Sequence, residues 1–366
     1  MAWPKPKGYS KSKVDWAGEV LSSRVSVKEK NHFKKKQEDQ ELALDILDNW
    51  RAIHRYPMHI FKKRLKRVAE KMHKDAFVAQ RLKRLPSIIT KLQREYYEQT
   101  GKMKLSRMQD IAGCRAVMPT IKLARELYEK EYLQGNIKHK KVNEKDYIKI
   151  PKEDGYRSIH LVYRYNSDKP KKQGYNGLLV EIQIRSKLQH LWATAIETVD
   201  LFTRQAIKSN EGRQEWKDFF RLVSSAFAIK EETAFVPNTP RNPKNLYKMI
   251  KEKEQELQVI KIMTNWAKAV RIFEREFKQK PDLQYFLLEL DILGEKLNIT
   301  GYTADEEQTA LEEYARIEKL HQGQKEYDVV LVGVDVAQDL KKAYPNYFAD
   351  TSEFLKELEK LLKKAE

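Results

Sequence analysis

The segment Val180-Glu-Ile-Gln-Ile-Arg185 alternates apolar and polar side chains. An alternation with a period of two is typical of a half-buried strand, and we predict a strand over residues 177–184. In such a strand Glu181, Gln183 and Arg185 project from the same face of a sheet. That face of the predicted sheet therefore carries charged and amide groups.

Strand-like and helical segments alternate on both sides of this strand. The turn-forming residues between 165 and 177 suit a hairpin loop to the preceding strand. Pro57 is expected to break the helical pattern of residues 38–80, because proline disrupts a helix interior. The other predicted elements are strands over 111–118 and 158–165 and helices over 121–133, from Leu188 onward and from Lys244 to about Lys278.

After Pro281 the pattern changes character. It predicts a strand over 284–293, a helix that the capping box Thr303-Ala-Asp-Glu306 opens and that ends at Leu320, a strand over 327–336 and a final helix from near Asp350. These elements suggest a small appended α+β module. We place the domain boundary between residues 1–271 and residues 272–366.

The composition limits the classes of protein that remain. The chain has 366 residues, a formal net charge of +18 and a mean hydropathy of −0.74. Its apolar runs are too short to cross a bilayer and its start lacks a signal-type apolar run, so we expect a globular cytoplasmic protein without membrane contact. Cys114 is the only cysteine, which excludes an internal disulfide and a zinc site built on several thiolates.

The positive charge is unevenly distributed. Residues 251–366 carry 24 acidic and 18 basic side chains, so the positive excess lies in the preceding residues. Each basic cluster is either a solvated helix face or a surface for a polyanion such as RNA, because phosphate binding needs clustered cations. The clusters proposed for a tRNA backbone are Lys34, Lys35 and Lys36, and then Lys62, Lys63 and Arg67.

The segment Arg81-Leu-Lys-Arg-Leu-Pro-Ser87-Ile-Ile-Thr-Lys91 combines cations with a helix start. Arg81 and Lys83 lie on one side of an extended segment, and the following proline suits the first turn of a helix. The exposed N–H groups of a helix start favour phosphate, and Lys91 lies about one turn after Ser87. The segment is a candidate triphosphate site, and surface decoration is the alternative.

Two acidic residues beside or within predicted strands are candidate metal ligands. Asp110 begins the segment Asp110-Ile-Ala-Gly-Cys-Arg115 just before an apolar strand, and Glu181 lies on another strand. Carboxylates that converge from two strands can hold Mg²⁺ once a triphosphate supplies further oxygen ligands. The alternative for each acid is a salt bridge to a neighbouring arginine.

The segment Gly155-Tyr-Arg-Ser-Ile-His160 leads from a turn into a strand. Gly155 permits a tight turn that presents Tyr156, whose ring can stack on a nucleobase, although a structural tyrosine is the alternative. His160 falls on the same strand face as Tyr156, where it is either a packed histidine or part of a site.

Taken in order, these motifs resemble those of the RelA/SpoT family of (p)ppGpp synthetases across residues 40–230. The patterns R-x-K-x-x-x-S-x-x-x-K, D-I-A-G-x-R, G-Y-R-S-x-H and E-I-Q-I-R are all present. The resemblance implies a nucleotidyltransferase-related fold with a mixed sheet flanked by helices. It also implies Mg²⁺-dependent transfer of pyrophosphate from ATP to a ribose 3′-hydroxyl.

The resemblance further implies residue roles. Asp110 would bind Mg²⁺, and Glu181 would assist the metal or activate the attacking hydroxyl. The residues that would hold ATP are Arg81, Lys83, Ser87, Lys91 and Arg115. Those that would meet the acceptor are Tyr156, which would stack its base, with His160, Gln183 and Arg185 around its phosphates.

The chain has no His-Asp dipeptide, so it resembles synthetase-only members that cannot degrade their product. The Trp50–Pro57 segment, the basic N-terminal helices and the appended module resemble the fused toxin–antitoxin branch known as CapRel. In that branch the implied acceptor is the 3′ adenosine of tRNA, whose modification stops translation. The C-terminal module is implied to dock on the active site until a phage structural protein engages it.

The segment Tyr344-Pro-Asn-Tyr347 matches the Y-x-x-Y pattern of the self-inhibiting segment of that branch. Paired aromatic rings could occupy the adenine slot beside Arg81 by cation–π stacking, or the two tyrosines could pack a turn between helices. The acidic tail and the basic body agree with such a docked arrangement.

Three functions remain open at the level of sequence. The first is an autoinhibited tRNA pyrophosphokinase that acts as a phage-responsive toxin, and the second is a small alarmone synthetase that makes (p)ppGpp from GTP or GDP and ATP. The third is an inactive RNA-binding protein that keeps the fold, and the intact acids Asp110 and Glu181 argue against it.

Overall fold

The structure is a computed structural model. It describes residues 3–22, 33–97, 103–203, 214–257, 259–261, 263–264, 282–291, 296–321, 324, 327–333 and 352–365. Within these ranges, every helix is either too short or too polar to cross a bilayer.

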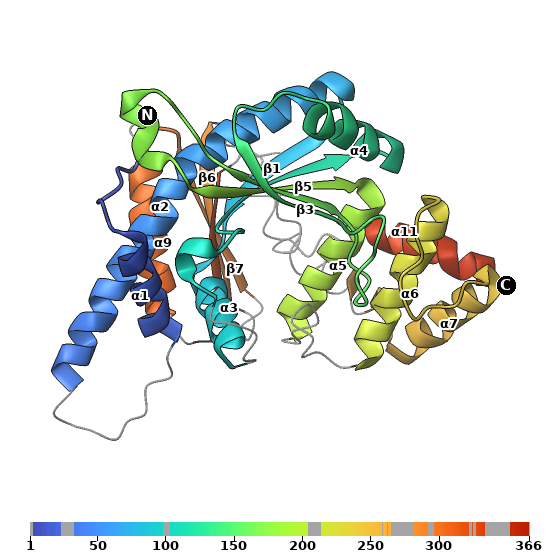
Figure 1. The fold of residues 1–366 in the computed structure, drawn as a ribbon. Helices are drawn as coiled ribbons and strands as arrows, with labels where there is room; N and C mark the ends of the chain where they lie inside the picture. The colour runs from blue at the N-terminus through green and yellow to red at the C-terminus, as the bar shows by residue number, and fades with distance from the viewer. Residues whose placement is uncertain are drawn as a thin grey trace.

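A five-stranded mixed sheet forms the centre of the molecule (Figure 1). The β2–β5 pair is parallel, and the other neighbouring strands are antiparallel. This arrangement confirms the expected α+β class with a mixed sheet flanked by helices. The strand order is β1 (Phe77–Leu82), β2 (Ala112–Met118), β5 (Leu179–Ser186), β4 (Ile159–Arg164) and β3 (Lys140–Asp146).

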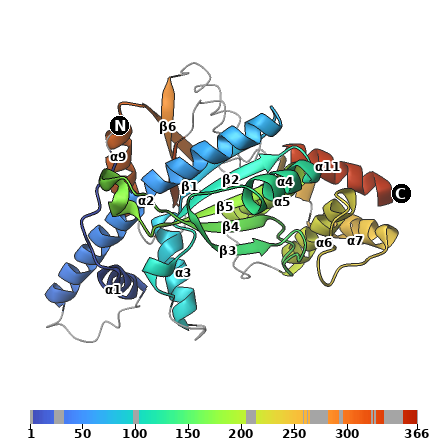
Figure 2. The same ribbon diagram turned by 45° about the horizontal axis from the view of Figure 1, so that its top comes forward.

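One face of this sheet is apolar and packs against helices. Helix α2 (Phe33–Met72) crosses over it, and α4 (Ile121–Tyr128) continues into the turn η3 (Glu129–Leu133) on the same side (Figure 2). Cys114, Ile182 and Leu161 of the three central strands are buried in this core. Their burial follows the period of two in the sequence, which leaves the opposite face polar.

The helices α3 (Leu85–Tyr97) and α5 (Lys187–Thr203) lie on the polar side of the sheet (Figure 1). Helix α1 (Lys11–Ser22) packs with α2 and α3 in a separate core. A further core joins α5 to α6 (Gln214–Lys230), α7 (Pro243–Leu257) and α11 (Ser352–Leu362). The short turns η2 (Leu105–Arg107), η4 (Pro170–Tyr175) and η7 (Lys363–Ala365) complete this part.

A second, antiparallel sheet lies in the C-terminal part of the chain, in the order β7 (Lys296–Thr303), β6 (Leu283–Asp291) and β8 (Tyr327–Gly333). Helix α9 (Glu307–Leu320) packs on it through an apolar face that includes Ala310, Tyr314 and Ile317. Half of the expected capping box is present, because the Thr303 N–H donates to Glu306 Oε2 at 2.8 Å. Helix α9 begins later than predicted, at Glu307, and its N-cap Glu306 makes no side-chain capping hydrogen bond.

The structure differs from the sequence predictions at a few elements. The prediction that Pro57 breaks the helix is wrong, because α2 runs through it. Ile53, Met58 and Phe61 flank the proline and are buried in one core, so packing outweighs the lost backbone hydrogen bond. The strands β1, β3 and β7 were not predicted. The domain boundary near residue 272 lies outside the described residues.

Candidate active site

The polar face of the central sheet gathers side chains from all four motifs. Strand pairing places Gly113 of β2 between Arg81 of β1 and Glu181 of β5. The neighbouring rung on the same face runs through Arg115, Gln183 and His160.

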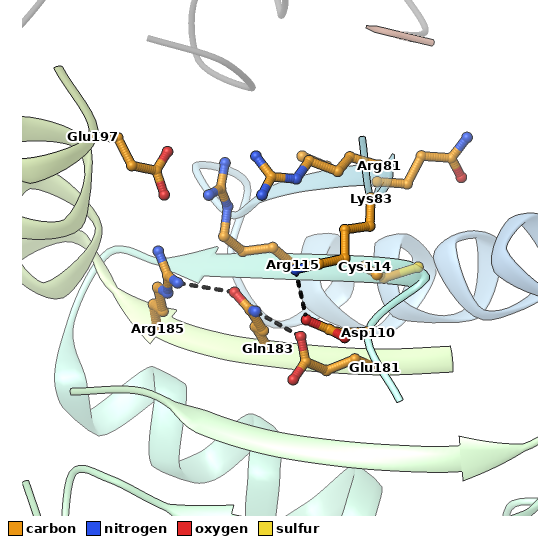
Figure 3. A pocket seen from close by; sticks show the side chains of 12 residues that line it. Arg81, Lys83, Asp110, Cys114, Arg115, Glu181, Gln183, Arg185 and Glu197 are labelled. Carbon is orange, nitrogen blue, oxygen red and sulfur yellow. Dashed lines mark hydrogen bonds and ion pairs between the residues drawn. The ribbon is translucent and has the colours of Figure 1, made fainter. Parts of the chain in front are cut away.

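A cavity of about 130 Å³ opens over this face (Figure 3). Gly113 leaves its floor open: a Cβ there would lie 3.9 Å from the Arg81 carbonyl oxygen and 4.0 Å from that of Glu181. The cavity therefore brings together the predicted metal ligands and most of the predicted ATP-binding cations. Its charged and amide lining includes Arg81, Lys83, Asp110, Arg115, Glu181, Gln183, Arg185 and Glu197.

Asp110 is held between two ammonium groups. Lys83 Nζ lies 3.0 Å from Asp110 Oδ2, and Lys91 Nζ lies 3.0 Å from Oδ1. Burial opposes ionisation of this carboxyl, but the two lysines outweigh burial and lower the pKa of Asp110 to about 2. Burial lowers the pKa of Lys83 itself, against the opposing effect of Asp110. Asp110 is thus a permanent anion at neutral pH, in a cluster that a metal–triphosphate could enter.

The predicted triphosphate segment spans β1 and α3. Lys83 lies just after β1, where its N–H donates to the Ile111 carbonyl at 2.7 Å. Ser87 lies in the first turn of α3, one turn before Lys91. The segment therefore holds its cations along one side of the cavity.

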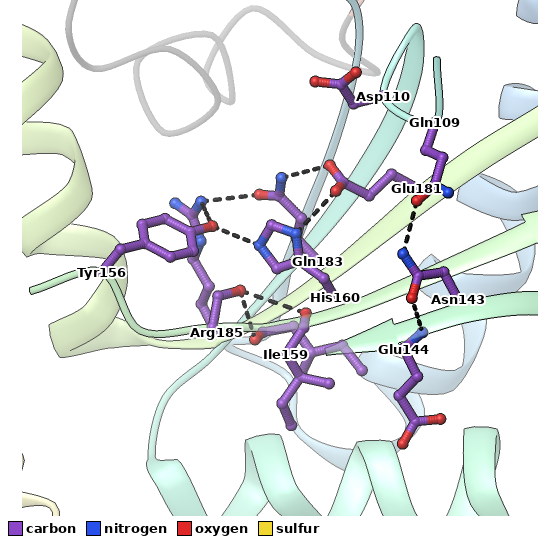
Figure 4. A network of polar contacts seen from close by, with 12 residues as sticks. Gln109, Asp110, Asn143, Glu144, Tyr156, Ile159, His160, Glu181, Gln183 and Arg185 are labelled. Carbon is purple, nitrogen blue, oxygen red and sulfur yellow. Dashed lines mark hydrogen bonds and ion pairs between the residues drawn. The ribbon is translucent and has the colours of Figure 1, made fainter. Parts of the chain in front are cut away.

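A chain of hydrogen bonds links Glu181 to Tyr156 through His160 (Figure 4). His160 Nδ1 lies 2.8 Å from Glu181 Oε1, and His160 Nε2 lies 2.7 Å from the Tyr156 hydroxyl oxygen. Gln183 Nε2 donates to the other Glu181 oxygen at 2.8 Å. Both oxygens of Glu181 are therefore oriented by neutral or cationic donors.

These contacts set the protonation states. Burial lowers the pKa of His160, but Tyr156 and Glu181 outweigh burial and raise it to about 9. Burial raises the pKa of Tyr156, but Arg185 and His160 outweigh burial and lower it to about 8. Burial likewise opposes ionisation of Glu181, yet hydrogen bonding to His160 lowers its pKa. His160 is therefore an imidazolium at neutral pH and donates through both ring nitrogens.

Arg185 closes this network at the sheet end near α5. It is 4% exposed, and one terminal nitrogen donates to the Tyr156 oxygen at 2.7 Å and to Gln183 Oε1 at 2.9 Å. Its Nε and its other terminal nitrogen are buried and have no hydrogen-bond partner within the described ranges. Buried donors left unpaired are costly, and Arg185 lines the cavity, so its guanidinium suits an anionic ligand.

Gly155 is required by the turn that carries Tyr156. Its φ is +94°, and a Cβ there would lie 2.9 Å from the Trp192 ring. Any other residue would be strained in backbone and side chain at this position. The turn thereby fixes Tyr156 beside Arg185, which lines the cavity, with the Lys152 ammonium 5.3 Å from the tyrosine ring centre.

Two residues near the site had no role in the sequence prediction. Glu197 of α5 borders the cavity opposite the sheet, with its carboxylate on the same side as Arg115 and Arg185 (Figure 3). In the sequence, the only indication for Glu197 is that an acidic residue occurs within an apolar helical segment. Lys152 lies 4.8 Å from the Tyr147 ring centre as well as near Tyr156, and only its position in the turn hinted at it.

Comparison with known proteins agrees with this geometry. Residues 80–200 match the family described as "Region found in RelA / SpoT proteins". The chain is 36% identical over 118 residues to the GTP pyrophosphokinase YjbM of Bacillus subtilis, and 34% identical over 115 residues to the GTP pyrophosphokinase YwaC of the same organism. These matches cover 32% and 31% of this chain and 53% and 52% of the relatives, so the chain spans about half the length of each.

Solved structures of small alarmone synthetases are also similar. Small alarmone synthetase 1 of Bacillus subtilis is 28% identical, with a TM-score of 0.40, over 49% of this chain and 89% of that one. A GTP pyrophosphokinase family protein of Streptococcus pneumoniae is 24% identical, with a TM-score of 0.39, over 48% of this chain and 85% of that one.

Residues 80–200 are therefore similar to the RelA/SpoT region. The matched residues include every candidate residue from Arg81 to Arg185. The basic clusters and the tyrosine pair lie outside them.

The remaining candidate residues, those outside residues 80–200, lie mostly on α2. Lys34, Lys35 and Lys36 lie in the first turns of α2. Lys63 and Arg67 are exposed farther along α2, on the side of the sheet opposite the cavity, and Lys62 is 9% exposed. Lys62 therefore offers little surface to an RNA backbone. Tyr344 and Tyr347 lie outside the described residues.

Proposed function

We propose that this protein transfers pyrophosphate from ATP to a ribose 3′-hydroxyl. The observation that carries the proposal is the single cavity in which Asp110 and Glu181 lie among Arg81, Lys83 and Arg115. Phosphoryl transfer needs positioned anions for a metal and cations for the developing phosphate charge, and this cavity holds both. The names of the two Bacillus subtilis relatives support the same reaction class.

The two carboxylates fit a Mg²⁺ site. Both are oxygen ligands with lowered pKa values, and they are close enough for the charge of Asp110 to affect the ionisation of Glu181. Bound Mg²⁺ would neutralise phosphate charge and favour departure of AMP. Lys83 and Lys91 would exchange Asp110 for phosphate oxygens when the nucleotide enters, because all three groups lie together.

The chain's own residues then account for the transfer step. The acceptor 3′-oxygen forms a bond to the β-phosphorus of ATP while the bond from that phosphorus to the α–β bridging oxygen breaks, and AMP leaves. Glu181, ionised and oriented by His160 and Gln183, takes the hydroxyl proton. Arg81 and Arg115 would hold the transferred phosphates, and Tyr156 would stack on the acceptor base.

The acceptor we favour is the 3′ adenosine of tRNA, and the edge of the sheet supports a polynucleotide. Lys145 pairs with His160, and Lys140 pairs with Arg164, so these cations share the cavity face of the sheet. All three cations are exposed, and no described residue forms an ion pair with any of them. Arg164 lies four residues beyond His160, about 14 Å along the strand. Phosphates of an RNA beyond its 3′ nucleotide could reach Lys140 and Arg164. A mononucleotide acceptor is too short to reach them from the cavity.

Synthesis of (p)ppGpp from GTP or GDP is the second candidate. The names of the two matched relatives, both GTP pyrophosphokinases, favour it. An inactive RNA-binding protein remains the third candidate, and the intact ionised carboxylates argue against it.

A side-by-side labelling assay separates these candidates. We expect γ-labelled ATP with Mg²⁺ to label the 3′ end of deacylated tRNA, and we expect the combined change Lys140→Ala and Arg164→Ala to weaken that labelling and its salt dependence. Lys141→Ala is the matched control, because Lys141 pairs with Tyr163 on the opposite face. Labelling of GTP or GDP instead of RNA would support the alarmone function. An absence of labelling in every arm, by the wild type and by the Tyr344→Ala/Tyr347→Ala variant alike, would favour the inactive protein.

We further propose that the enzyme is an autoinhibited toxin of anti-phage defence. The support is the resemblance of the appended module and of Tyr344-Pro-Asn-Tyr347 to the fused branch, together with the acidic character of residues 251–366. In this proposal the module docks on the active site of its own chain, and a phage structural protein releases it.

A further inference from the structure

We propose that Glu318, on helix α9, is a positioning residue for the ATP site. The proposal rests on the proposed function, because it assigns Lys83 to ATP. Glu318 is far from the four motifs in sequence. Its carboxylate accepts a hydrogen bond from the backbone N–H of Leu85, two residues after Lys83.

Glu318 makes two buried contacts with the N-terminal part of the chain, one with α3 and one with α2. Its Oε1 accepts the Leu85 N–H at 2.9 Å, and its Oε2 lies 3.3 Å from a terminal nitrogen of Arg51 on α2. Glu318 is 7% exposed and Arg51 is 6% exposed. A pair this buried is not a surface salt bridge, and loss of one partner leaves an uncompensated charge.

Arg51 extends the cluster to the next peptide group. Its Nε donates to the Lys83 carbonyl oxygen at 3.2 Å, and its other terminal nitrogen donates to the Tyr314 hydroxyl at 2.8 Å. Tyr314 lies on α9, one turn before Glu318. This cluster therefore binds the backbone on both sides of Arg84, at the Lys83 carbonyl and at the Leu85 N–H.

These backbone hydrogen bonds orient the side chain of Lys83. The Lys83 N–H is held by Ile111 at 2.7 Å and its carbonyl by Arg51, so both of its backbone groups are fixed. The side chain then reaches Asp110 at 3.0 Å. Leu85 begins α3, so a carboxylate on its N–H also complements the positive end of the helix that carries Lys91.

Another α2–α9 contact provides a matched control. Arg55 of α2 pairs with Glu307 in the first turn of α9, and both side chains are largely buried. The Leu85 N–H and the Lys83 carbonyl have their hydrogen bonds with Glu318 and Arg51, and not with this pair. A change at Glu307 therefore weakens docking of α9 without removing the Leu85 hydrogen bond.

The test measures amide hydrogen exchange of residues 83–90 in the full-length chain, together with binding of a non-hydrolysable ATP analogue and Mg²⁺ by calorimetry. We expect Glu318→Ala to speed exchange at Leu85 and to weaken analogue binding, each about 10-fold, because a charged hydrogen bond to a buried donor is lost. Glu318→Gln keeps an oxygen for the Leu85 N–H and should restore most of the protection. Glu307→Ala should match the wild type in both measurements.

Wild-type exchange at Leu85 in Glu318→Ala would overturn the positioning role, as would equal effects of Glu307→Ala and Glu318→Ala. If Glu318→Ala fails to fold, Glu318→Gln decides: it loses only the charge pair with Arg51, so the proposal requires a small increase in Leu85 exchange and a small loss of analogue binding that Glu307→Ala does not show. Absence of analogue binding by both the wild type and the Tyr344→Ala/Tyr347→Ala variant would instead reject the proposed function, while exchange at Leu85 still decides the role of Glu318.

Discussion

At the scale of single residues, the site is defined by which groups stay charged. Asp110 and Glu181 remain anions because lysines surround one and His160 donates to the other. The motif spacing predicted which side chains share a sheet face, since strand alternation fixes that. It could not predict the His160–Tyr156 bond or the position of Glu197 at the cavity, because these depend on the turn before β4 and on how α5 packs against the sheet.

The histidine makes a testable contribution to pH-dependent stability. The pKa of His160 is about 9 in the folded protein and about 6.5 when unfolded, so its stabilising effect is complete below pH 6.5 and is lost as pH rises through 9. Between pH 6.5 and 8, we expect this group to remove on the order of 2 kcal/mol from the free energy of unfolding. Urea titrations at both pH values should show that loss in the wild type and a smaller one in His160→Gln. Equal pH dependence in the two proteins would contradict the imidazolium assignment.

At the scale of elements, most strands with a clear apolar pattern were predictable, although β1 and β7 were missed despite their apolar residues. The strands β2, β4 and β5 were found because their apolar side chains alternate or cluster. The edge strand β3 reads Lys-Lys-Val-Asn-Glu-Lys-Asp and carries little apolar signal, so only its pairing with β4 reveals it. Helix α2 continues through Pro57 because tertiary packing overrides local propensity.

Helix α11 gives a prediction at this scale. Phe354 is fully buried beside Phe220 and Phe227 of α6, although it lies near the C-terminus. Phe354→Ala should lower the free energy of unfolding by about 3–5 kcal/mol, because it leaves a cavity in this core. Lys356→Ala on the exposed side of α11 is the control and should stay within about 0.5 kcal/mol of the wild type. Similar stabilities of both variants, measured by chemical denaturation, would show that α11 does not belong to the core.

At the scale of the whole molecule, described residues beyond 282 contact the part of the chain built around the five-stranded sheet through several elements, and some of these contacts involve ion pairs. Helix α9 meets α2 through Arg51 and Arg55, and α11 joins α5 through the Lys187–Glu353 pair as well as the shared core. The sequence predicted an appended module and its elements except β7. It did not predict these contacts, because they join residues far apart in the sequence, 267 positions in the case of Arg51 and Glu318.

The autoinhibition proposal has its own prediction at this scale. Expression of the wild type should allow growth, and expression of the Tyr344→Ala/Tyr347→Ala variant should stop it, because the two aromatic rings proposed to block the active site are removed. The measurement is growth after induction, with protein amount followed by immunoblot. Adding Asp110→Asn should restore growth. Normal growth of the double variant at wild-type protein levels would remove the autoinhibition proposal.

The central claim is that Asp110 and Glu181 serve one cavity in which ATP donates pyrophosphate. The most direct test measures AMP formation and label transfer from γ-labelled ATP, with tRNA, GTP and GDP as acceptors. It compares the Tyr344→Ala/Tyr347→Ala chain with the same chain carrying Asp110→Asn or Glu181→Gln. We predict equal amounts of AMP and labelled acceptor for the parent chain and a loss of at least about 100-fold with either further change, since each removes a charge that acts in the transition state. Undiminished transfer by either variant would contradict the account.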